Sequence, residues 1–550
     1  MKRIFFLLLI ISAHHISNAQ SWQDTIDIID KMFDRYKPGN PGCQLAISRN
    51  GQVIFSRAWG MADLEHAVPL TTESVIEAGS ISKQFTAAAI LLLEQQGKLA
   101  IDDDVRKYVP ELPDYGTPIT LRQMMQHTSG LKDWGSIAEI AGWPRSTKTY
   151  NNDDALYIIA RQKTLNNKPG DEFLYSNSNY NLFAVIVERV SGISLAQFTR
   201  LHIFEPAGMK HTEWRNNFKK VVLNRAMAYE RSGTGYLTNM PNEYVYGNGG
   251  LLTTAEDLLI WNDYYLNGKL GNPSLLKKQL AVSALNNGKM NWYAAGLFTD
   301  SLRGRKTISH SGATAGYRSN LYCFPDLGLT IVWLSNTSEF DQVGSPVNSI
   351  RDLLVTNISV VKNINELPPV TIPIEKLNSY TGWYKDPRTG LALKLFVRDG
   401  RLANSRGGNL IPVAENVFMS GPNKIEILPV KPSKLRFITP VDTLHFFAVD
   451  SAKPDEKTMN DYAGKYYSEE AEAKFDIIFK DGKLVASRNP TSDYLFSPTY
   501  KDGFSSPAGD IYFERDKKLQ VTSMKISVGR ARNVEFRKMK TERPPILSTK

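Results

Sequence analysis

Cysteine is almost absent from this chain. Its 550 residues include only Cys43 and Cys323, so the chain has no dense disulfide framework of the kind that stabilises small secreted domains. The eight histidines are scattered without the spacing of a metal site, and no glycine-rich loop suited to phosphate binding occurs. We therefore expect no metal and no cofactor.

Long hydrophobic runs are also missing. No stretch after the N-terminus reaches about 18 uninterrupted apolar residues, so we expect no stable membrane insertion. The N-terminus has Lys2-Arg3, an apolar core from Ile4 to Ser12, and Ser17-Asn18-Ala19 as a small-residue cleavage site. This order is typical of a signal peptide over residues 1–19, and its apolar run is too short to span a bilayer. We expect a periplasmic or secreted mature protein.

Charge of one sign is not concentrated anywhere. The chain has 66 basic and 56 acidic residues, a net charge of +10, which falls to +8 when Lys2 and Arg3 are removed. Because the two signs are interspersed, we interpret this charge as a solvated surface and expect no nucleic-acid partner. A mild attraction to anionic cell-wall polymers remains open, which makes peptidoglycan a candidate partner.

The most informative feature present is Ser80-Ile81-Ser82-Lys83, at the start of an almost wholly apolar helical segment. Residues i and i+3 are neighbours on a helix, so the Ser80 hydroxyl lies beside the Lys83 amine. A lysine can deprotonate a serine when burial, nearby cations or a helix N-terminus lower its pKa. The segment predicts a nucleophilic serine, although an isolated Ser-x-x-Lys more often lies on a solvent-facing helix.

Two further motifs follow in order along the chain. Tyr175-Ser176-Asn177 comes after a Pro-Gly turn, and His310-Ser311-Gly312 precedes a strand-like run. Their lead residues are separated from Ser80 and from each other by 95 and 135 positions. Alone, each would be a half-buried tyrosine in a turn or a surface histidine. The ordered set of three is far more specific.

With these motifs the chain resembles the serine β-lactamases and penicillin-recognising hydrolases, in the branch of class C β-lactamases, D-alanyl-D-alanine carboxypeptidases and D-aminopeptidases. The resemblance covers about residues 24–360 and includes Leu99–Val105, Gln126–Leu131, Phe204–Met209 and Gly247–Leu251. It implies an α+β, β-lactamase/transpeptidase-like fold, with an antiparallel sheet flanked by helices, a helical lobe, and a cleft between them. The tyrosine of the second motif points to this branch, while histidine in place of lysine at 310 leans away from a dedicated β-lactamase.

The resemblance assigns a proton relay. Ser80 attacks an acyl carbonyl, and Lys83 and Tyr175 share its proton and pass it to the leaving amine or alcohol. A phenol titrates near ~10 unless a cation lies close. Lys83 and a protonated His310 are expected to supply that charge.

The resemblance also assigns the substrate contacts. Asn177 orients the substrate amide, while Ser311 and Gly312 lie on the strand that lines the cleft, with Gly312 allowing close backbone approach. The backbone N–H groups of Ser80 and Ala313 form the oxyanion hole. In the family's sheet the strand around Ile331 separates the two cysteines, which implies free buried thiols. We interpret His127 as structural.

The C-terminal third of the chain is an internal repeat. Leu377–Tyr384 matches Met459–Tyr466 at an offset of 82 residues, and Asp399-Gly400 matches Asp481-Gly482 at the same offset. Asp-Gly between short β-type runs is the mark of a hairpin. We expect two small antiparallel, lipocalin-like β-barrels, which places the hydrolase domain at 20–362, a linker at 363–376, and the barrels at 377–455 and 456–541.

The role of the barrels is open at this stage. The architecture resembles that of D-aminopeptidases, in which barrel loops help to shape the substrate site, while spacers or wall-binding modules are the alternative. The proline-rich linker indicates a boundary that few contacts need to cross, so we expect the catalytic domain to fold without the barrels.

The sequence thus predicts an exported serine hydrolase that forms an acyl-enzyme. Its expected substrates are small peptides carrying D-amino acids, or related amides and esters. A β-lactamase or a carboxylesterase is the alternative among enzymes. A penicillin-binding sensor or scaffold without turnover is the alternative from another class.

Overall fold

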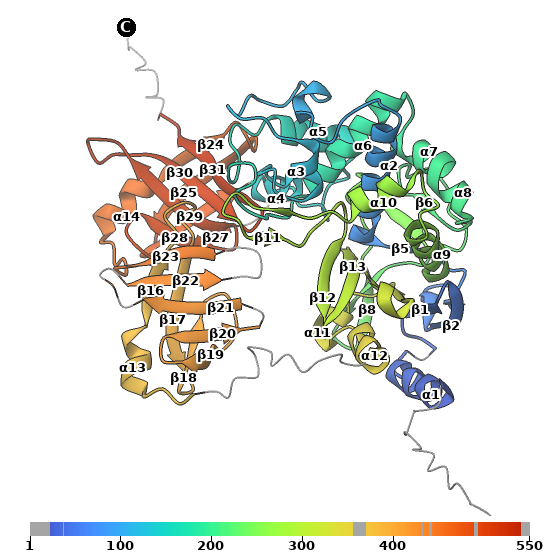
Figure 1. The fold of residues 1–550 in the computed structure, drawn as a ribbon. Helices are drawn as coiled ribbons and strands as arrows, with labels where there is room; N and C mark the ends of the chain where they lie inside the picture. Colours follow the sequence, from blue (N-terminus) through green and yellow to red (C-terminus); the bar gives the residue numbers. More distant parts are fainter. Residues whose placement is uncertain are drawn as a thin grey trace, which may run out of the picture.

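The computed structural model describes residues 22–36, 38–355, 370–421, 423–428, 430, 433–438, 443–488 and 493–540. The predicted signal peptide lies outside these residues, as does the first half of the predicted linker, whose last three residues already belong to helix α13 (Ile374–Ser379). Figure 1 shows a mixed helix and sheet domain beside two β-rich bodies.

A six-stranded antiparallel sheet forms the centre of the catalytic domain, in the order β12-β13-β14-β15-β1-β2. Strand β15, which lies between β14 and β1, is buried along its whole length because helices cover both faces of the sheet. Asn50 and Gly51 both have positive φ, as the tight turn between β1 and β2 requires. The strands are β1 (Cys43–Arg49), β2 (Gln52–Trp59), β12 (Phe298–Leu302), β13 (Arg305–Thr314), β14 (Tyr317–Phe324) and β15 (Leu329–Ser335).

Helices pack on both faces of this sheet. On one face α1 (Trp22–Phe33) and α12 (Pro346–Leu354) bury an apolar cluster that includes Trp333. On the other lie α2 (Lys83–Gln95), α9 (Ala255–Leu266) and α10 (Pro273–Gln279). The expected state of the two cysteines is confirmed: both are buried and free, on β1 and β14 with β15 between them.

The helical lobe lies between α2 and the last strands of the sheet in the sequence. It contains α3 (Leu121–Met125), α4 (Trp134–Ile140), α5 (Asn152–Ala160), α6 (Asn177–Ser191), α7 (Leu195–Thr199) and α8 (Glu205–Ala207). Among the described residues no single helix could cross a membrane; α6 and the segment Leu195–Ala207, bent by 77°, pass that test only as a pair, by length and composition.

Short strands and helical turns complete the domain. The short strands pair as β3 with β4, β7 with β8 and β10 with β11, and β9 lies between β5 and β6. Their bounds are β3 (Met61–Asp63), β4 (Val68–Pro69), β5 (Ile76–Glu77), β6 (Glu213–Trp214), β7 (Tyr229–Ser232), β8 (Gly235–Thr238), β9 (Leu251–Thr253), β10 (Ser283–Ala284), β11 (Met290–Asn291), α11 (Phe340–Val343), η1 (Gly79–Ser82), η2 (Val105–Lys107), η3 (Arg200–Phe204) and η4 (Pro325–Leu327).

The two repeat units form one nearly closed and one closed barrel. In the first, the eight-stranded sheet runs β18-β17-β16-β23-β22-β21-β20-β19, and its two edges meet through a single bridge between Ala403 and Asn409. Its elements are β16 (Gly382–Lys385), β17 (Ala392–Arg398), β18 (Arg401–Asn404), β19 (Ile411–Ala414), β20 (Val417–Ser420), β21 (Asn423–Leu428), β22 (Lys434–Ile438) and β23 (Thr443–Val449).

In the second unit the barrel is closed, because β31 pairs back onto β24. Helix α14 (Glu456–Tyr462) precedes it. The strands are β24 (Gly464–Ser468), β25 (Ala473–Lys480), β26 (Lys483–Arg488), β27 (Asp493–Pro498), β28 (Gly503–Ser506), β29 (Gly509–Arg515), β30 (Val521–Val528) and β31 (Ala531–Lys538).

The repeat is visible in individual hydrogen bonds. The Tyr384 hydroxyl donates to the Tyr380 carbonyl at 2.9 Å, and Tyr466 donates to Tyr462 at 2.7 Å, which is the same bond 82 residues later. Both predicted Asp-Gly hairpins form, with positive φ at both residues of each turn. The two units therefore fold alike, as the sequence offset predicts.

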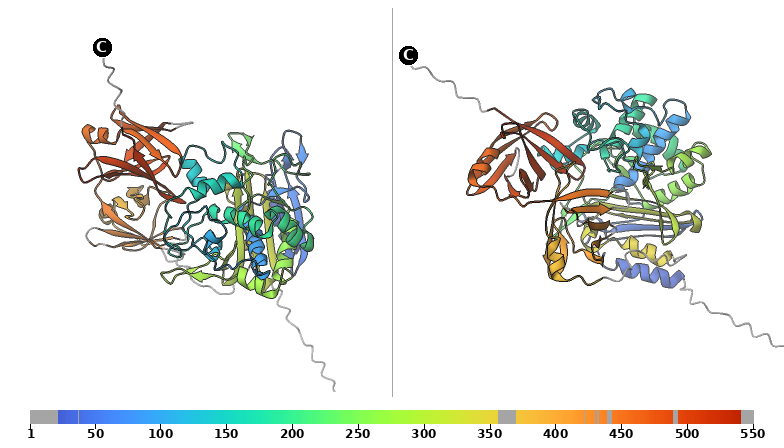
Figure 2. Two further views of the ribbon diagram at one scale, coloured as in Figure 1. Left: turned by 90° about the horizontal axis from the view of Figure 1, so that it is seen from above. Right: turned by 60° about the vertical axis from the view of Figure 1, so that its left-hand side comes forward.

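The expectation that few contacts join the barrels to the catalytic domain is wrong. Figures 1 and 2 show the second barrel against the helical lobe, and Ile137 and Ile140 of α4 belong to that barrel's apolar core, each 1% exposed. Arg488 of the barrel donates to the Glu139 and Ile140 carbonyls at the end of α4, both at 2.7 Å. The core of the second barrel therefore includes side chains of the helical lobe, which the composition of a linker cannot reveal.

Candidate active site

Ser80 and Lys83 meet at the junction of η1 and α2. Lys83 Nζ lies 3.0 Å from Ser80 Oγ and 3.0 Å from Asn177 Oδ1, and it also donates to the Asn248 carbonyl. An amide oxygen and a backbone carbonyl accept hydrogen bonds but cannot donate them. A neutral lysine would use its two N–H groups on these oxygens, which leaves its lone pair facing the Ser80 hydroxyl.

Burial favours that neutral state. The Lys83 side chain is fully buried, and burial lowers the pKa of its amine well below the usual value, with a further lowering from Arg530 and an opposing effect of Asp133. A charged amine loses its hydration on burial, so the proton leaves more readily. A neutral Lys83 is what the predicted role requires, because only the unprotonated amine can accept the Ser80 proton.

Tyr175 and Asn177 lie at the start of α6. The Asn177 N–H donates to Asp133 Oδ2 at 2.7 Å, which fixes the first residue of the helix. Lys83 Nζ is 4.8 Å from the centre of the Tyr175 ring. Burial raises the pKa of the Tyr175 phenol, and the nearby Ser80 hydroxyl opposes this effect by favouring the ionised form. The phenol makes no hydrogen bond of regular geometry among the described groups.

His127 supports Tyr175 from behind. Its ring centre is 4.1 Å from that of Tyr175, and its Nδ1 accepts the Ser176 backbone N–H at 3.2 Å. Burial lowers its pKa far below the ordinary range, so the ring is neutral. These contacts fit the structural role that we expected.

His310 does not carry the charge that the sequence analysis expects of it. Its Nδ1 lies 2.6 Å from the Ser311 carbonyl, so Nδ1 must be the donor, and its Nε2 lies 2.9 Å from the Tyr293 hydroxyl. Burial, with a smaller contribution from Lys83, lowers the pKa of His310 to about 3. The ring is neutral at physiological pH, so a different residue must supply any second cation beside Tyr175.

Strand β13 passes very close to the serine segment, and glycine makes that possible. A side chain on Gly312 would place Cβ 2.1 Å from the Ala78 carbonyl oxygen, and one on Gly79, where φ is +52°, would lie 2.8 Å from the Ala313 nitrogen. Gly312 therefore permits the close backbone approach that its position predicts. The backbone of Ala313 lies against Ser80's own segment, the arrangement that a two-donor oxyanion site needs.

A cavity of about 550 Å³ opens over these groups. Lys83 is the one predicted site residue that does not line this cavity. The lining includes all the others: Ser80, Tyr175, Asn177, His310, Ser311, Gly312 and Ala313. A second cavity of about 450 Å³ shares Asn177 and Ala313 with the first and extends toward Asp133 and Glu243. The fold therefore brings together residues from three distant parts of the sequence.

The second barrel reaches this cleft through the turn between β30 and β31. Arg530, at that turn, lines both cavities, and its guanidinium lies 4.9 Å from the centre of the Tyr175 ring. The Arg530 carbonyl accepts hydrogen bonds from the Asp133 N–H and from Asn166 Nδ2, both at 3.0 Å. The sequence analysis missed Arg530, because no local pattern links it to a motif 355 positions earlier.

Both barrels also hold the loop that leads to Tyr175. The buried Glu172 carboxylate accepts from Arg532 of the second barrel at 2.9 Å and from Arg388 of the first. Lys132 and Glu470 form a second buried ion pair between the lobe and the second barrel, at 2.8 Å. The position of the tyrosine motif thus depends on all three domains.

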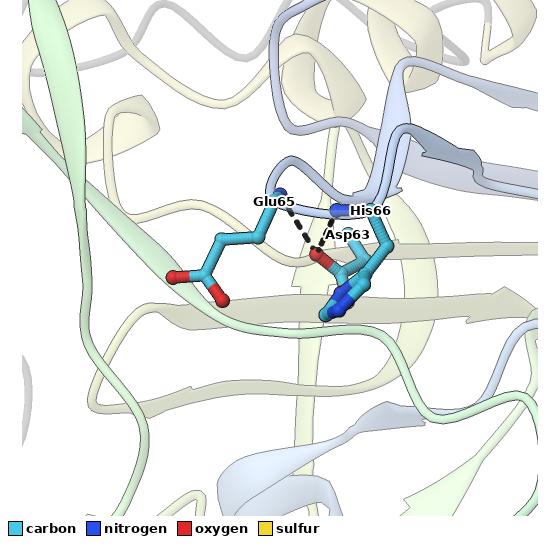
Figure 3. Close-up of side chains that lie close together, drawn as sticks. All are labelled: Asp63, Glu65 and His66. Atoms are coloured by element: carbon cyan, nitrogen blue, oxygen red, sulfur yellow. Dashed lines mark hydrogen bonds and ion pairs between the residues drawn. The ribbon is translucent and has the colours of Figure 1, made fainter.

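Among the described residues one group could approach the geometry of a metal site, and it lies outside the cleft. Figure 3 shows Asp63, Glu65 and His66 close together. Asp63 already accepts the backbone N–H groups of Glu65 and His66 through Oδ1, and its Oδ2 lies 2.8 Å from His66 Nδ1. These bonds are those of a surface turn.

The fold and the site together define a serine hydrolase of the penicillin-recognising type. Residues 28–353 match the family described as Beta-lactamase, and the chain belongs to that family. Among curated relatives, a D-aminopeptidase of Cereibacter sphaeroides is 26% identical over 474 residues, covering 84% of this chain and 86% of its own. A D-aminopeptidase of Brucella melitensis biotype 2 is 23% identical over 532 residues, covering 91% and 96%.

Solved structures share the fold at low identity. The octameric penicillin-binding protein homologue from Pyrococcus abyssi has a TM-score of 0.51 and 21% identity, covering 84% of this chain and 97% of its own. The D-amino acid amidase from Ochrobactrum anthropi SV3, complexed with L-phenylalanine, has a TM-score of 0.50 and 20% identity, covering 60% and 98%. The first similarity extends beyond the catalytic domain.

Proposed function

We propose that this chain is an exported serine hydrolase that forms an acyl-enzyme on Ser80 and cleaves peptides carrying D-amino acids, or related small amides and esters. The observation that carries the proposal is the placement of Lys83, a buried amine whose Nζ lies 3.0 Å from Ser80 Oγ. A serine needs such a base to become nucleophilic.

The catalytic steps follow from this arrangement. Ser80 Oγ attacks the substrate carbonyl carbon, and its proton passes to Lys83, with Tyr175 beside it as the group that returns a proton to the leaving amine or alcohol. The carbonyl oxygen becomes an oxyanion, which the backbone N–H groups of Ser80 and Ala313 would stabilise. The leaving group departs with the proton, and water then attacks the ester on Ser80 through the same relay in reverse.

The remaining site residues orient the substrate. Asn177 has its Oδ1 engaged by Lys83, so its Nδ2 is the group available to a substrate carbonyl. Ser311 and Gly312 lie on an edge of the cavity where an extended peptide backbone could lie beside β13. His310, held neutral between Tyr293 and the Ser311 carbonyl, contributes shape and hydrogen bonding.

The preference for D-amino acids is supported by the relatives. Two of them are named D-aminopeptidase, and a solved structure with the same fold is named D-amino acid amidase. Export is supported by the N-terminal pattern of residues 1–19, and an exported enzyme of this kind would meet peptidoglycan fragments.

The test uses matched substrates of opposite chirality. Hydrolysis of D-alanyl and L-alanyl p-nitroanilides, D-Ala-D-Ala peptides, a cephalosporin and a p-nitrophenyl ester is measured with the purified mature chain and with Ser80→Ala. We expect D-substrates to be cleaved at least tenfold faster than their L-counterparts, and no turnover by Ser80→Ala. Equal rates for both chiralities would contradict the substrate class, and full activity of Ser80→Ala would contradict the mechanism.

A further inference from the structure

The cleft contains three arginines, and one of them makes no ion pair among the described residues. Arg145 pairs with Glu243, and Arg318 pairs with Asp341 at 2.8 Å. The backbone carbonyl of Arg530 accepts a hydrogen bond from the Asp133 N–H of the catalytic domain, and its guanidinium lies over the Tyr175 ring. Its charge is therefore not balanced by a neighbouring carboxylate at contact distance.

A buried carboxylate, Asp133, also lies near the relay, and it lines one of the two cavities together with Arg530. Asp133 is buried and is held by hydrogen bonds alone: its Oδ2 accepts from the Asn177 N–H at 2.7 Å and its Oδ1 from the Ser136 N–H at 3.1 Å. It fixes the first residues of α4 and α6, so it is needed for structure. Its negative charge, however, favours the protonated form of Lys83 and the neutral form of Tyr175.

We propose that Arg530 is a positioning residue of the proton relay: from the second barrel it supplies the positive charge that offsets Asp133, which keeps Lys83 ready to accept the Ser80 proton and helps Tyr175 to release its own proton to the leaving group. Lys83 and Arg530 lie at similar distances from the Tyr175 ring, 4.8 and 4.9 Å. The proposal rests on the proposed function, because it concerns the same relay.

The other charged and titratable groups around the relay do not replace Arg530. His127 and His310 are neutral, because burial lowers the pKa of both. Tyr293 is a buried phenol whose pKa is raised by burial, and the charge of Arg145 is offset by Glu243. The effect of Arg530 on the pKa of Lys83 is second only to burial and opposes that of Asp133.

The sign of the effect is the same for both members of the relay. A nearby cation disfavours the ammonium form of Lys83 and favours the phenolate form of Tyr175, so it lowers both pKa values. Removal of the cation raises both. The acid limb of the activity profile reports the deprotonation of Lys83, so it must then move to higher pH.

The test measures Ser80 modification as a function of pH, so it does not depend on knowing the substrate. A fluorophosphonate forms a bond between Ser80 Oγ and phosphorus, fluoride leaves, and the serine proton goes to the relay. In Arg530→Gln we expect the midpoint of the acid limb to rise by about half to one pH unit, the size of effect that a Coulomb interaction between nearby charges in a partly solvated site allows. That shift slows modification about 3- to 10-fold on the acid limb and leaves the alkaline plateau unchanged.

Two further variants separate charge from other effects. Arg530→Lys keeps the charge and should keep the wild-type midpoint. Arg537→Gln removes the same charge from an exposed position of β31 that lines neither cavity, and it should also keep the midpoint. The hydrogen bonds of residue 530 to the catalytic domain come from its backbone carbonyl, which the substitution does not change. Arg530→Gln should therefore melt at the wild-type temperature.

Each contrary outcome has a distinct meaning. An unchanged midpoint in Arg530→Gln, or an equal loss of rate at every pH, overturns the proposal. A raised KM confined to substrates with a carboxylate, at an unchanged midpoint, also overturns it and makes Arg530 a substrate-binding residue. Failure of the wild-type chain to be labelled at Ser80 contradicts the proposed function itself.

Discussion

At the scale of single residues, the site depends on which groups burial keeps neutral. Lys83 has three polar neighbours within hydrogen-bond reach, and none of its described partners is a carboxylate, so a charge on its amine is opposed by burial and favoured only by the more distant Asp133. His310 is held by a hydroxyl and a carbonyl, and burial lowers its pKa to about 3. The catalytic chemistry therefore starts from uncharged groups in a site whose charges lie at its rim.

Lys83→Met tests this view of the lysine. Methionine has a similar volume and no charge, and the Lys83 side chain is wholly buried. The avoided burial of a charge opposes the loss of the hydrogen bonds to Asn177 and Asn248, so we expect the melting temperature to stay close to that of the wild type. The turnover number should fall by at least about 10³, because the base that activates Ser80 is lost. Thermal unfolding and steady-state kinetics on one preparation check both parts. A large loss of stability would mean that Lys83 is charged in the folded chain.

Tyr175→Phe tests the second member of the relay. The ring contacts with His127 and Arg530 remain, while the proton-carrying hydroxyl is lost. We expect the turnover number to fall by about 10² to 10⁴ and KM to change by less than threefold. Tyr293→Phe is the matched control, since it removes a phenol of the same pocket that contacts His310 instead of Ser80. Equal effects of the two substitutions would remove Tyr175 from the relay.

At the scale of elements, the sequence is informative where chemistry is local. The Ser80-Lys83 pair follows from helix spacing, and the Asn-Gly and Asp-Gly turns follow from the positive φ that hairpins require. The approach of β13 to η1 could be predicted only because Gly312 is a glycine in a motif. Arg530 could not be predicted, because its role depends on how a barrel docks and not on its neighbours in the sequence.

The incomplete closure of the first barrel is a second feature that the repeat does not reveal. Both units share the first hairpin and the Tyr380/Tyr462 contacts, yet the described edge strands β18 and β19 of the first unit do not pair with each other, and Ala403 of β18 instead bridges to Asn409, which precedes β19. In the second unit the corresponding strands β26 and β27 pair from Leu484–Phe496 to Ser487–Asp493. Closure depends on the lengths and pairing of strands outside the matched segments.

Glu172 is the element-scale test of how the barrels position the tyrosine loop. Glu172→Gln removes the carboxylate shared by Arg388 and Arg532 and leaves the largely buried Arg532 without its counter-ion. We expect a loss of about 3 kcal/mol in the free energy of unfolding, since breaking a buried pair leaves an uncompensated charge. Urea unfolding measures it. Arg388→Gln, at the more exposed partner, should cost less, and a larger cost there would contradict this assignment.

At the scale of the whole molecule, buried contacts join the second barrel to the helical lobe. The second barrel takes two isoleucines of α4 into its core and caps the end of that helix with Arg488. Its turn contributes Arg530 to the cleft. A catalytic domain separated from the barrels would lose both the cover of α4 and a charge beside its relay.

Truncation after residue 355 tests this dependence. It exposes Ile137 and Ile140, each of which contributes roughly 1.5–3 kcal/mol through burial, and it leaves the buried Lys132 without Glu470. We expect the truncated chain to aggregate or to melt at least 10 °C below the full chain, measured by light scattering and thermal unfolding. The truncated chain with Ile137→Ser and Ile140→Ser should be more soluble, because the exposed apolar patch is gone. A truncated chain that keeps the melting temperature and the Ser80 labelling profile of the full chain would show that the barrels are spacers.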